Sequence, residues 1–208
     1  MISVYQLKTK FQNILRPLTN ALAKAGITAN HVTISAFMMS ALVGFIIYKF
    51  AHKNNIVLLI LPIFLFVRMA LNAIDGMLAR EHAQKSRLGA ILNELGDVLS
   101  DAVIYAPFLI VIGTGEYLTI TAISLAIISE TVGIMGIQIG ADRRYDGPMG
   151  KSDRAFWFSV IAILEVLFKL PLSVINALIG IIAALLVFTI FNRIKKALEF
   201  QPAAKEDK

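Results

Sequence analysis

Two carboxylates and two amides recur at helical spacing between residues 68 and 101, a stretch that lies between apolar segments. Asn72 and Asp75 are three residues apart, and Asn93 and Asp97 are four apart, so each pair lies on one face of a helix. A charged side chain at the centre of a membrane helix costs about 2.5–3.5 kcal/mol on insertion scales. We therefore expect these side chains to face one another, a metal ion or an aqueous cavity.

An antiparallel hairpin would bring the two pairs to the same depth. If the chain turns near residue 84, residues whose numbers sum to about 169 lie level, because both helices rise by ~1.5 Å per residue. Asn72 then lies opposite Asp97, and Asp75 lies opposite Asn93. The hairpin therefore predicts that four oxygen-bearing side chains converge.

Small residues and one further pair of charges fall on the same hairpin. Gly76, Ala79 and Gly89 lie on the side of the four polar residues, where they leave room for a ligand or for close backbone approach. Arg68 lies level with Asp101, two turns further along the axis than Asn93. We expect Arg68 and Asp101 to form an ion pair with a structural role on the membrane side of the site.

The same stretch resembles the signature of the CDP-alcohol phosphatidyltransferase family, Asp-x2-Asp-Gly-x2-Ala-Arg-x8-Gly-x3-Asp-x3-Asp. The positions that match at the right spacing are Asp75, Gly76, Ala79, Arg80, Gly89 and Asp97. The range 71–101, together with the segments TANHVT and GPMGKSDRA, is similar to the YnbA-like bacterial branch of the family. The resemblance implies a membrane enzyme of phospholipid biosynthesis. It would transfer a phosphatidyl or phosphoalcohol group from a CDP-alcohol, such as CDP-diacylglycerol, to an acceptor hydroxyl and release CMP.

Asparagine stands at two positions where the family has aspartate, Asn72 and Asn93. The resemblance implies that Asn72, Asp75, Asn93 and Asp97 hold Mg²⁺ or Mn²⁺, and that Asp97 is the general base toward the acceptor hydroxyl. An amide oxygen can ligate a hard cation but adds no charge. We expect weaker metal binding, or one ion where relatives hold two.

Substrate contacts are also carried over from the resemblance. Asn30 matches a Thr-Pro-Asn-x-x-Thr sequence that the family often shows near the nucleotide, although Ala29 replaces the proline here. Arg80 is expected to orient a carboxylate or a phosphate at the mouth of the site. The other expected substrate-binding positions of the motif are Gly76, Ala79 and Gly89.

The loop from Ala141 to Ala155 concentrates basic residues among turn-forming ones. Guanidinium and ammonium groups suit a diphosphate or an anionic acceptor, so the candidate ligands are Arg143, Arg144, Lys151 and Arg154. Anchoring of positive charge at the membrane boundary explains each of them equally well. Lys151 is favoured because family members resemble it with a Gly-Lys at this loop.

Composition excludes a soluble domain and thiol chemistry. The chain has 208 residues, of which 57% are hydrophobic, and it contains no cysteine, so disulfides and thiolate metal sites are absent. Its net charge of +6 lies mostly at membrane boundaries. Anionic lipid is the nearer partner there, and we expect no nucleic acid.

Six apolar stretches predict an all-α integral membrane protein with a bundle of six transmembrane helices. Their approximate ranges are 32–50, 56–80, 88–112, 117–141, 155–170 and 172–193. Residues 3–24 alternate apolar and basic side chains at helical spacing, which predicts an N-terminal amphipathic helix on the membrane surface. The expected domains are a cytoplasmic lead at 1–30, the membrane domain at 31–195 and a cytoplasmic tail at 196–208.

Basic residues are distributed unequally between the two ends of such a bundle. Sixteen Lys and Arg residues fall on the side of both termini, and only Lys49, Lys53 and Lys169 fall on the other. The positive-inside rule therefore predicts a protein of the inner membrane with a cytoplasmic active site and cytoplasmic termini. The family resemblance further implies a homodimer.

Two other functions remain open at this stage. A catalytically weakened pseudoenzyme or CDP-lipid-binding scaffold would explain the two asparagines, and an ion or proton transporter would explain intramembrane acids. Glu130 and Glu165 lie inside predicted spans without an obvious partner. Each could line the cavity or be protonated between helices, and we favour the second alternative. The sequence does not specify the acceptor alcohol.

Overall fold

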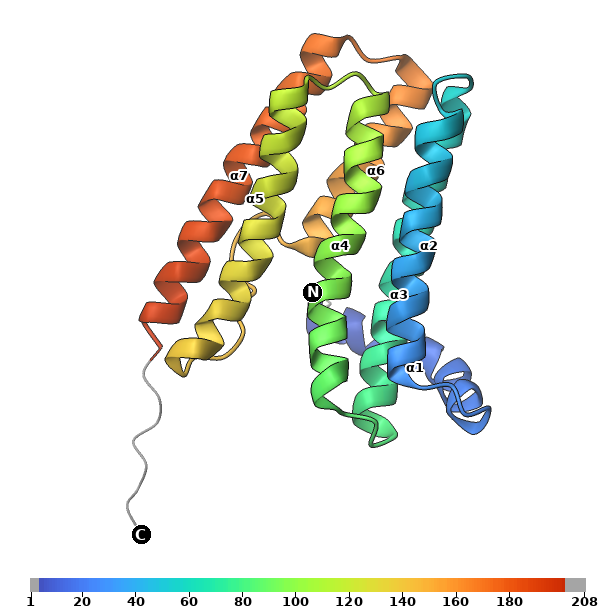
Figure 1. Ribbon diagram of the computed structural model, residues 1–208, viewed down its shortest axis with the longest axis vertical. Coiled ribbons are helices and arrows are strands. Elements are labelled where there is room, and N and C mark those ends of the chain that lie inside the picture. The colour runs from blue at the N-terminus through green and yellow to red at the C-terminus, as the bar shows by residue number, and fades with distance from the viewer. Residues whose placement is uncertain (1–3, 201–208) are drawn as a thin grey trace.

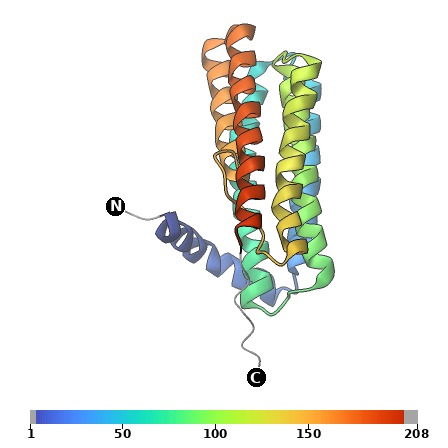
Figure 2. The same ribbon diagram turned by 90° about the vertical axis from the view of Figure 1, so that its left-hand side faces the viewer.

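The computed structural model describes residues 4–200, with side chains from residue 9 onward, and this range is entirely helical with connecting turns. The elements are α1 (Val4–Lys24), α2 (Ala29–Phe50), the 3-10 segment η1 (Asn55–Leu59), α3 (Ile60–Glu81), α4 (Arg87–Val111), α5 (Glu116–Met135), the 3-10 segment η2 (Gly136–Ile139), α6 (Lys151–Phe168) and α7 (Leu172–Leu198). Helices α2 to α7 run roughly along one axis, and α1 crosses one end of the bundle at a steep angle (Figure 1, Figure 2). Most of the predicted tail, residues 201–208, lies outside the described range.

Four helices of the described range are long and apolar enough to cross a membrane. They are Ala29–Phe50, Asn55–Glu81, Glu116–Ile139 and Leu172–Leu198. Helices α4 and α6 lie alongside them, within a few residues of the predicted ranges, but they carry charged residues such as Asp97, Asp101 and Arg154. The helical membrane architecture is therefore confirmed, while composition by itself supports four spans and not six.

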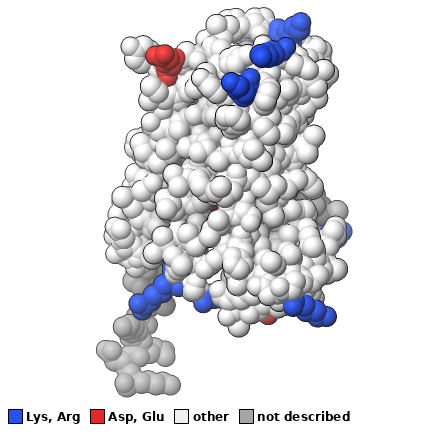
Figure 3. All heavy atoms as spheres, turned by 45° about the vertical axis from the view of Figure 1, so that its right-hand side comes forward, with Lys and Arg blue, Asp and Glu red and all other residues white. Residues whose placement is uncertain are grey.

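The outer surface of the bundle is apolar over most of its length. Large side chains such as Phe45, Ile63, Ile120 and Phe188 are about 60% exposed or more. Figure 3 shows a broad belt with almost no charged side chains between two ends that carry charge. Soluble proteins rarely expose such large apolar patches, so the belt is the surface that faces lipid.

Short polar side chains set where two of the helices begin. The Thr28 hydroxyl accepts a hydrogen bond from the backbone N–H of His31 and starts α2, and the Ser86 hydroxyl accepts one from Gly89 and starts α4. The turn between α3 and α4 spans residues 82–86, as the predicted hairpin requires. Because Thr28 supplies the cap, the side chain of Asn30 is left for other contacts.

Helix α1 is docked on α3. Arg16 donates to both carboxylate oxygens of Glu81 at 3.1 and 3.0 Å, and the buried Thr19 lies against Met77. Leu15 packs against the small apolar cluster under this end of the bundle. This docking fixes α1 beside the end of α3 that carries the motif residues described below.

Helices α2 and α4 approach closely at Gly44. An added Cβ at Gly44 would collide with the carbonyl oxygen of Val103, whereas one at Gly180 would meet no atom within 4 Å. Gly44→Ala should therefore push α2 away from α4 and destabilise the fold by about 1–3 kcal/mol. Thermal unfolding in detergent measures this, with Gly180→Ala as the matched control. Equal melting temperatures for the two variants would contradict the close approach.

Candidate active site

The α3–α4 hairpin has the register that helical rise predicts. Nδ2 of Asn72 donates to Oδ1 of Asp97 at 3.3 Å, and Nη1 of Arg68 donates to Oδ1 of Asp101 at 2.6 Å. Both of these level pairs are therefore confirmed as contacts. No hydrogen bond joins the third expected pair, Asp75 and Asn93, among the described side chains. Asn93 is half-buried on α4, one turn before Asp97.

Every oxygen of the Asp97 carboxylate has a donor close by. This side chain is only 7% exposed. Oδ1 faces Asn72 and lies 3.7 Å from Nη2 of Arg68, and Oδ2 lies 2.6 Å from Nζ of Lys151. Nη2 of Arg68 also donates to the backbone carbonyl of Asp97 at 3.0 Å. Asp97 is thus the residue at which α3, α4 and α6 meet.

The Asp75 carboxylate is held from α2. Asp75 is 5% exposed, and its Oδ2 accepts a hydrogen bond from Oγ1 of Thr33 at 3.0 Å. Asp75 also lies close enough to Asp97 and Lys151 for both charges to act on it. The role of Thr33 was not predicted, although it is the last residue of the TANHVT segment that carried part of the resemblance.

Polar side chains of this protein occupy the space beside the motif glycines. A Cβ added at Gly89 would lie 2.8 Å from Oδ1 of Asn30, so the Asn30 amide rests against the first turn of α4. A Cβ added at Gly76 would lie 3.1 Å from the guanidinium of Arg80, which folds back along α3. Ala79 packs in the small apolar cluster at this end. These small residues let Asn30 and Arg80 approach the backbone.

The loop between η2 and α6 places Lys151 at the depth of Asp97. Residues 141–150 run from the end of the bundle toward its middle, where α6 begins (Figure 1). The backbone N–H of the fully buried Met149 donates to Oγ1 of Thr189 at 2.9 Å. Gly147, with φ of 127°, lies so close to Thr189 that a Cβ would be 2.7 Å from its Cα. The loop is therefore fixed to α7 directly before Lys151.

Beneath the site lies a buried network of ion pairs. Arg154 is fully buried, and its Nε and Nη2 donate to Oδ2 of Asp101 at 3.0 and 2.6 Å. Nη2 of Arg154 also lies 3.1 Å from Oε1 of Glu130, which accepts from Arg193 as well. Arg193 additionally donates to the backbone carbonyl of Ser129. The network joins α4, α5, α6 and α7.

The expectation that Glu130 has no partner was wrong, and Glu130 also lines the cavity described below. Three guanidinium groups surround its carboxylate, those of Arg143, Arg154 and Arg193, at 3.1–3.4 Å. Sequence analysis missed these pairs because the three arginines lie in a loop and in two other helices. No role was predicted for Arg193, whose only sequence signal is a charge near the end of an apolar span.

A cavity of about 270 Å³ opens next to Lys151. It is lined by Glu130, Arg143, Tyr145, Gly150, Lys151, Ser152, Asp153 and Arg193. The guanidinium of Arg143 lies 2.7 Å from Oε2 of Glu94 and stacks on the Tyr145 ring at 4.7 Å. Arg144 does not line this cavity, because it pairs with Asp146 at 3.2 Å. Of the four basic residues predicted to bind phosphate, the structure places Arg143 and Lys151 at the cavity.

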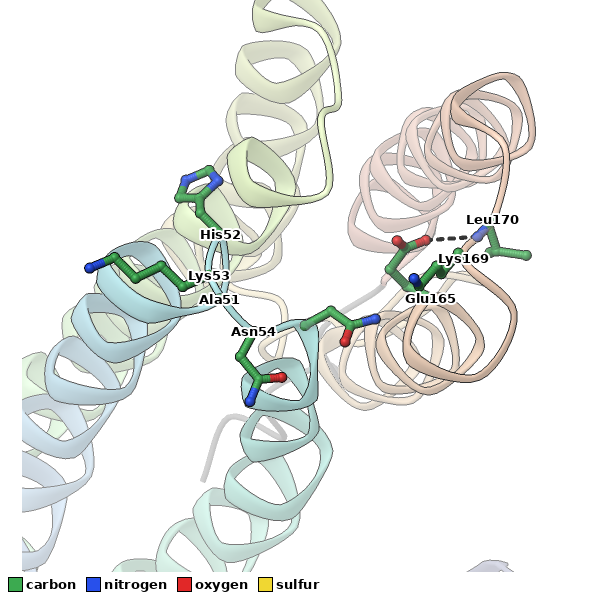
Figure 4. A pocket seen from close by; sticks show the side chains of 8 residues that line it. Ala51, His52, Lys53, Asn54, Glu165, Lys169 and Leu170 are labelled. Atoms are coloured by element: carbon green, nitrogen blue, oxygen red, sulfur yellow. Dashed lines mark hydrogen bonds between the residues drawn. The ribbon is translucent and has the colours of Figure 1, made fainter.

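Glu165 lies far from this site, at the opposite end of the bundle. Its Oε2 accepts a hydrogen bond from the backbone N–H of Leu170 at 3.0 Å, beside an open pocket lined also by His52, Lys53 and Lys169 (Figure 4). Glu165 therefore lines a pocket at this end of the bundle and is not enclosed between helices. It is a capping residue of the turn between α6 and α7.

The donor atoms around Asp97 suit a hard divalent cation. Among the described residues there is no group of three or more Asp, Glu, His or Cys that could hold a metal. The four motif positions offer two carboxylates and two amides, which together present only oxygen ligands. The ammonium of Lys151 already lies on Oδ2 of Asp97, so this carboxylate accommodates positive charge. By ligand type, these residues fit a divalent cation.

Residues 26–195 match the family model for CDP-alcohol phosphatidyltransferase. The chain belongs to this family. The inner membrane protein YnbA of Escherichia coli (strain K12) is 43% identical over 197 residues, which cover 95% of this chain and 97% of YnbA. The archaetidylinositol phosphate synthase of Pyrococcus horikoshii is 35% identical over 97 residues, 47% of this chain and 48% of that protein. Both the family and the similarity to YnbA are therefore confirmed.

Solved structures of one CDP-alcohol phosphatidyltransferase share the fold. The phosphatidylinositol phosphate synthase of Mycobacterium tuberculosis in complex with manganese and citrate matches with a TM-score of 0.73 at 18% identity, over 92% of each chain. The same enzyme with CDP-DAG bound also gives 0.73 at 18% identity, over 94% of this chain and 98% of that one. Family and fold together make this protein an integral membrane member of a transferase family of phospholipid biosynthesis.

Proposed function

We propose that this chain transfers a phosphatidyl or phosphoalcohol group from CDP-diacylglycerol, or a related CDP-alcohol, to an acceptor hydroxyl with release of CMP. One observation carries the proposal: the carboxylates of Asp75 and Asp97 are buried on neighbouring helices, and Asp97 pairs with Lys151, which lines a cavity together with Arg143. A structure with the same fold was solved with CDP-DAG bound, and the apolar belt gives acyl chains access to the bundle.

We propose further that Asn72, Asp75, Asn93 and Asp97 hold Mg²⁺ or Mn²⁺. Their oxygen-only donor set supports this, and a structure of the same fold contains manganese. When bound, the cation would offset charge on the phosphoryl oxygens and on the leaving CMP. Two carboxylates can neutralise one divalent ion, so the site is proposed to hold one.

The roles of the individual side chains follow from their positions. Asp97 would accept the proton of the acceptor hydroxyl as that oxygen attacks the β-phosphorus. Lys151 and Arg143 would donate hydrogen bonds to phosphate oxygens or to the acceptor from the wall of the cavity. Arg80 is exposed, its guanidinium lies beside Gly76, and it would orient an anionic group at the mouth.

Two of the predicted substrate ligands take a different role in this proposal. All three nitrogens of the Arg154 guanidinium are engaged by Asp101, Glu130 or the carbonyl oxygen of Met149. Arg154 would therefore position α4 against α6 and not contact substrate. Arg144 would stabilise its own loop, because its backbone N–H donates to the carbonyl of Gly133 and its side chain pairs with Asp146.

The topology proposed here has six membrane-spanning helices. Asp101 of α4 and Arg154 of α6 are buried and paired, which lowers the cost of placing them in a bilayer. The excess of Lys and Arg at the end with the site supports a cytoplasmic active site and cytoplasmic termini in an inner membrane. In this arrangement α1 lies at the cytoplasmic surface, 31–195 is the membrane domain, and the chain forms a homodimer.

The purified protein with CDP-diacylglycerol, Mn²⁺ and a panel of alcohols should release CMP with at least one acceptor. A pseudoenzyme or CDP-lipid-binding scaffold, which the two asparagines favour, would bind CDP-diacylglycerol without releasing CMP. An ion or proton transporter would dissipate a gradient in vesicles and ignore the nucleotide. It is disfavoured because the buried acids Asp101 and Glu130 are paired with arginines.

Thr33→Val tests whether Asp75 contributes to metal binding. The change keeps the shape of the side chain but removes the only described side-chain donor to Oδ2 of Asp75. Loss of such an orienting hydrogen bond typically weakens metal affinity about 10-fold. Titration with Mn²⁺, followed by the electron paramagnetic resonance of the free ion, measures the change. Thr131→Val on the exposed face of α5 is the control and should leave the affinity unchanged.

A further inference from the structure

Lys151 occupies the oxygen of Asp97 that the proposed chemistry needs. Its Nζ lies 2.6 Å from Oδ2, while Oδ1 already faces Asn72 and Arg68. A metal ion bound by Asp97, or a proton accepted by it, requires a free lone pair on one of these oxygens. Lys151 is the partner that can move most easily, because its side chain is 33% exposed and that of Arg68 only 5%.

The ammonium of Lys151 offsets a large fraction of the negative charge in this site. Asp75 and Asp97 together supply two negative charges, because Asn72 and Asn93 supply none. Arg68 is compensated by Asp101, whose other oxygen is taken by Arg154. One ammonium therefore offsets half of the negative charge available to a divalent cation. Like charges a few ångströms apart disfavour each other strongly in a partly buried site.

The attachment of Lys151 allows its side chain to change partners without unfolding its surroundings. Lys151 is the first residue of α6, and the loop before it is fixed through Met149 and Gly147 to Thr189. The ammonium is joined to this fixed backbone by a flexible four-carbon chain, so it can leave Asp97 by side-chain rotation alone. The same side chain lines the 270 Å³ cavity, so its ammonium can reach either the carboxylate or an anion in that cavity.

We propose that Lys151 is an exchangeable counter-ion of Asp97, which competes with the divalent cation until the diphosphate of the CDP-alcohol draws its ammonium away. Metal binding and nucleotide binding are then coupled through one side chain. This proposal rests on the proposed function, because it uses the same metal site and the same donor. It gives Lys151 a role before the reaction, in addition to contact with phosphate.

Mn²⁺ affinity of the protein in detergent, with and without CDP-diacylglycerol, tests the coupling by the electron paramagnetic resonance of free Mn²⁺. In the unchanged protein, CDP-diacylglycerol should tighten Mn²⁺ binding roughly tenfold, a common size for coupled sites. Lys151→Gln should bind Mn²⁺ roughly tenfold more tightly without the lipid, and the lipid should add little. Lys151→Arg keeps the charge and should retain weak binding in the absence of the lipid.

Lys85→Gln is the matched control, because Lys85 is an exposed lysine in the turn between α3 and α4. It should behave like the unchanged protein, and the melting temperatures of all variants establish that each is folded. Equal or weaker Mn²⁺ binding by Lys151→Gln would overturn the counter-ion role. The transferase proposal would not fall with it, because CMP release by the unchanged protein tests that proposal separately. If no variant binds Mn²⁺, the metal site of the proposed function fails, and the counter-ion role fails with it.

Discussion

Asp97→Asn should abolish CMP release, with a loss of at least about 10³-fold. A positioned general base contributes about 10²–10⁴-fold, and this change also removes one of only two carboxylates at the proposed metal site. The asparagine keeps the size of the side chain and can still bond to Asn72, so the helices should stay in place. The measurement is CMP release at saturating Mn²⁺ and CDP-diacylglycerol.

The control for this prediction is Asp142→Asn, an exposed carboxylate in the loop before α6. It lies at the same end of the bundle but outside the site, and it should keep nearly full activity. Both variants should retain the melting temperature of the unchanged protein within a few degrees. An Asp97→Asn variant that keeps a tenth or more of the activity would remove Asp97 from the role of general base.

Arg154→Met should be the most destabilising single change among those considered. Methionine has a similar length but no charge, so Asp101 loses two hydrogen bonds and Glu130 loses one inside the bundle. Removing one partner of a buried ion pair costs about 3–5 kcal/mol. For a protein of this size that corresponds to a fall of about 10 °C in the melting temperature. Thermal unfolding in detergent measures it.

Lys196→Met is the matched control, since it removes a cation from the exposed pair with Glu199. Exposed ion pairs contribute little, and the melting temperature should not change measurably. If Arg154→Met has the same melting temperature as the unchanged protein, the buried network does not stabilise the bundle. If it melts normally but loses CMP release, Arg154 contacts substrate, as the sequence analysis first suggested.

The Asp97→Asn and Arg154→Met variants also separate the proposed transferase from its main alternative. A CDP-lipid-binding scaffold would show the loss of stability in Arg154→Met but no CMP release to lose in Asp97→Asn. The two asparagines would remove charge from the proposed metal site but keep its oxygen ligands, which is compatible with the proposed transferase. In the proposed site, Lys151 on Asp97 would offset one of the two negative charges when no metal ion is bound.

The local hairpin was predictable from the sequence by itself. Arg68 and Asp101 are 33 residues apart, and Asn72 and Asp97 are 25 apart, yet both pairs follow from one turn and a constant rise per residue. The apolar belt and the helical class also follow from composition, because a bilayer requires long apolar helices.

Contacts between helices that are not joined by a short turn were decided only by the tertiary structure. Thr33 meets Asp75 across 42 residues, Lys151 meets Asp97 across 54, and Arg193 meets Glu130 across 63. Helical periodicity fixes which face a side chain lies on, but not which helix packs against that face. The partners of Glu130 and the position of Lys151 therefore depend on the packing of the whole bundle. Sequence determined the motif and its helices, while packing determined how the buried charges are paired.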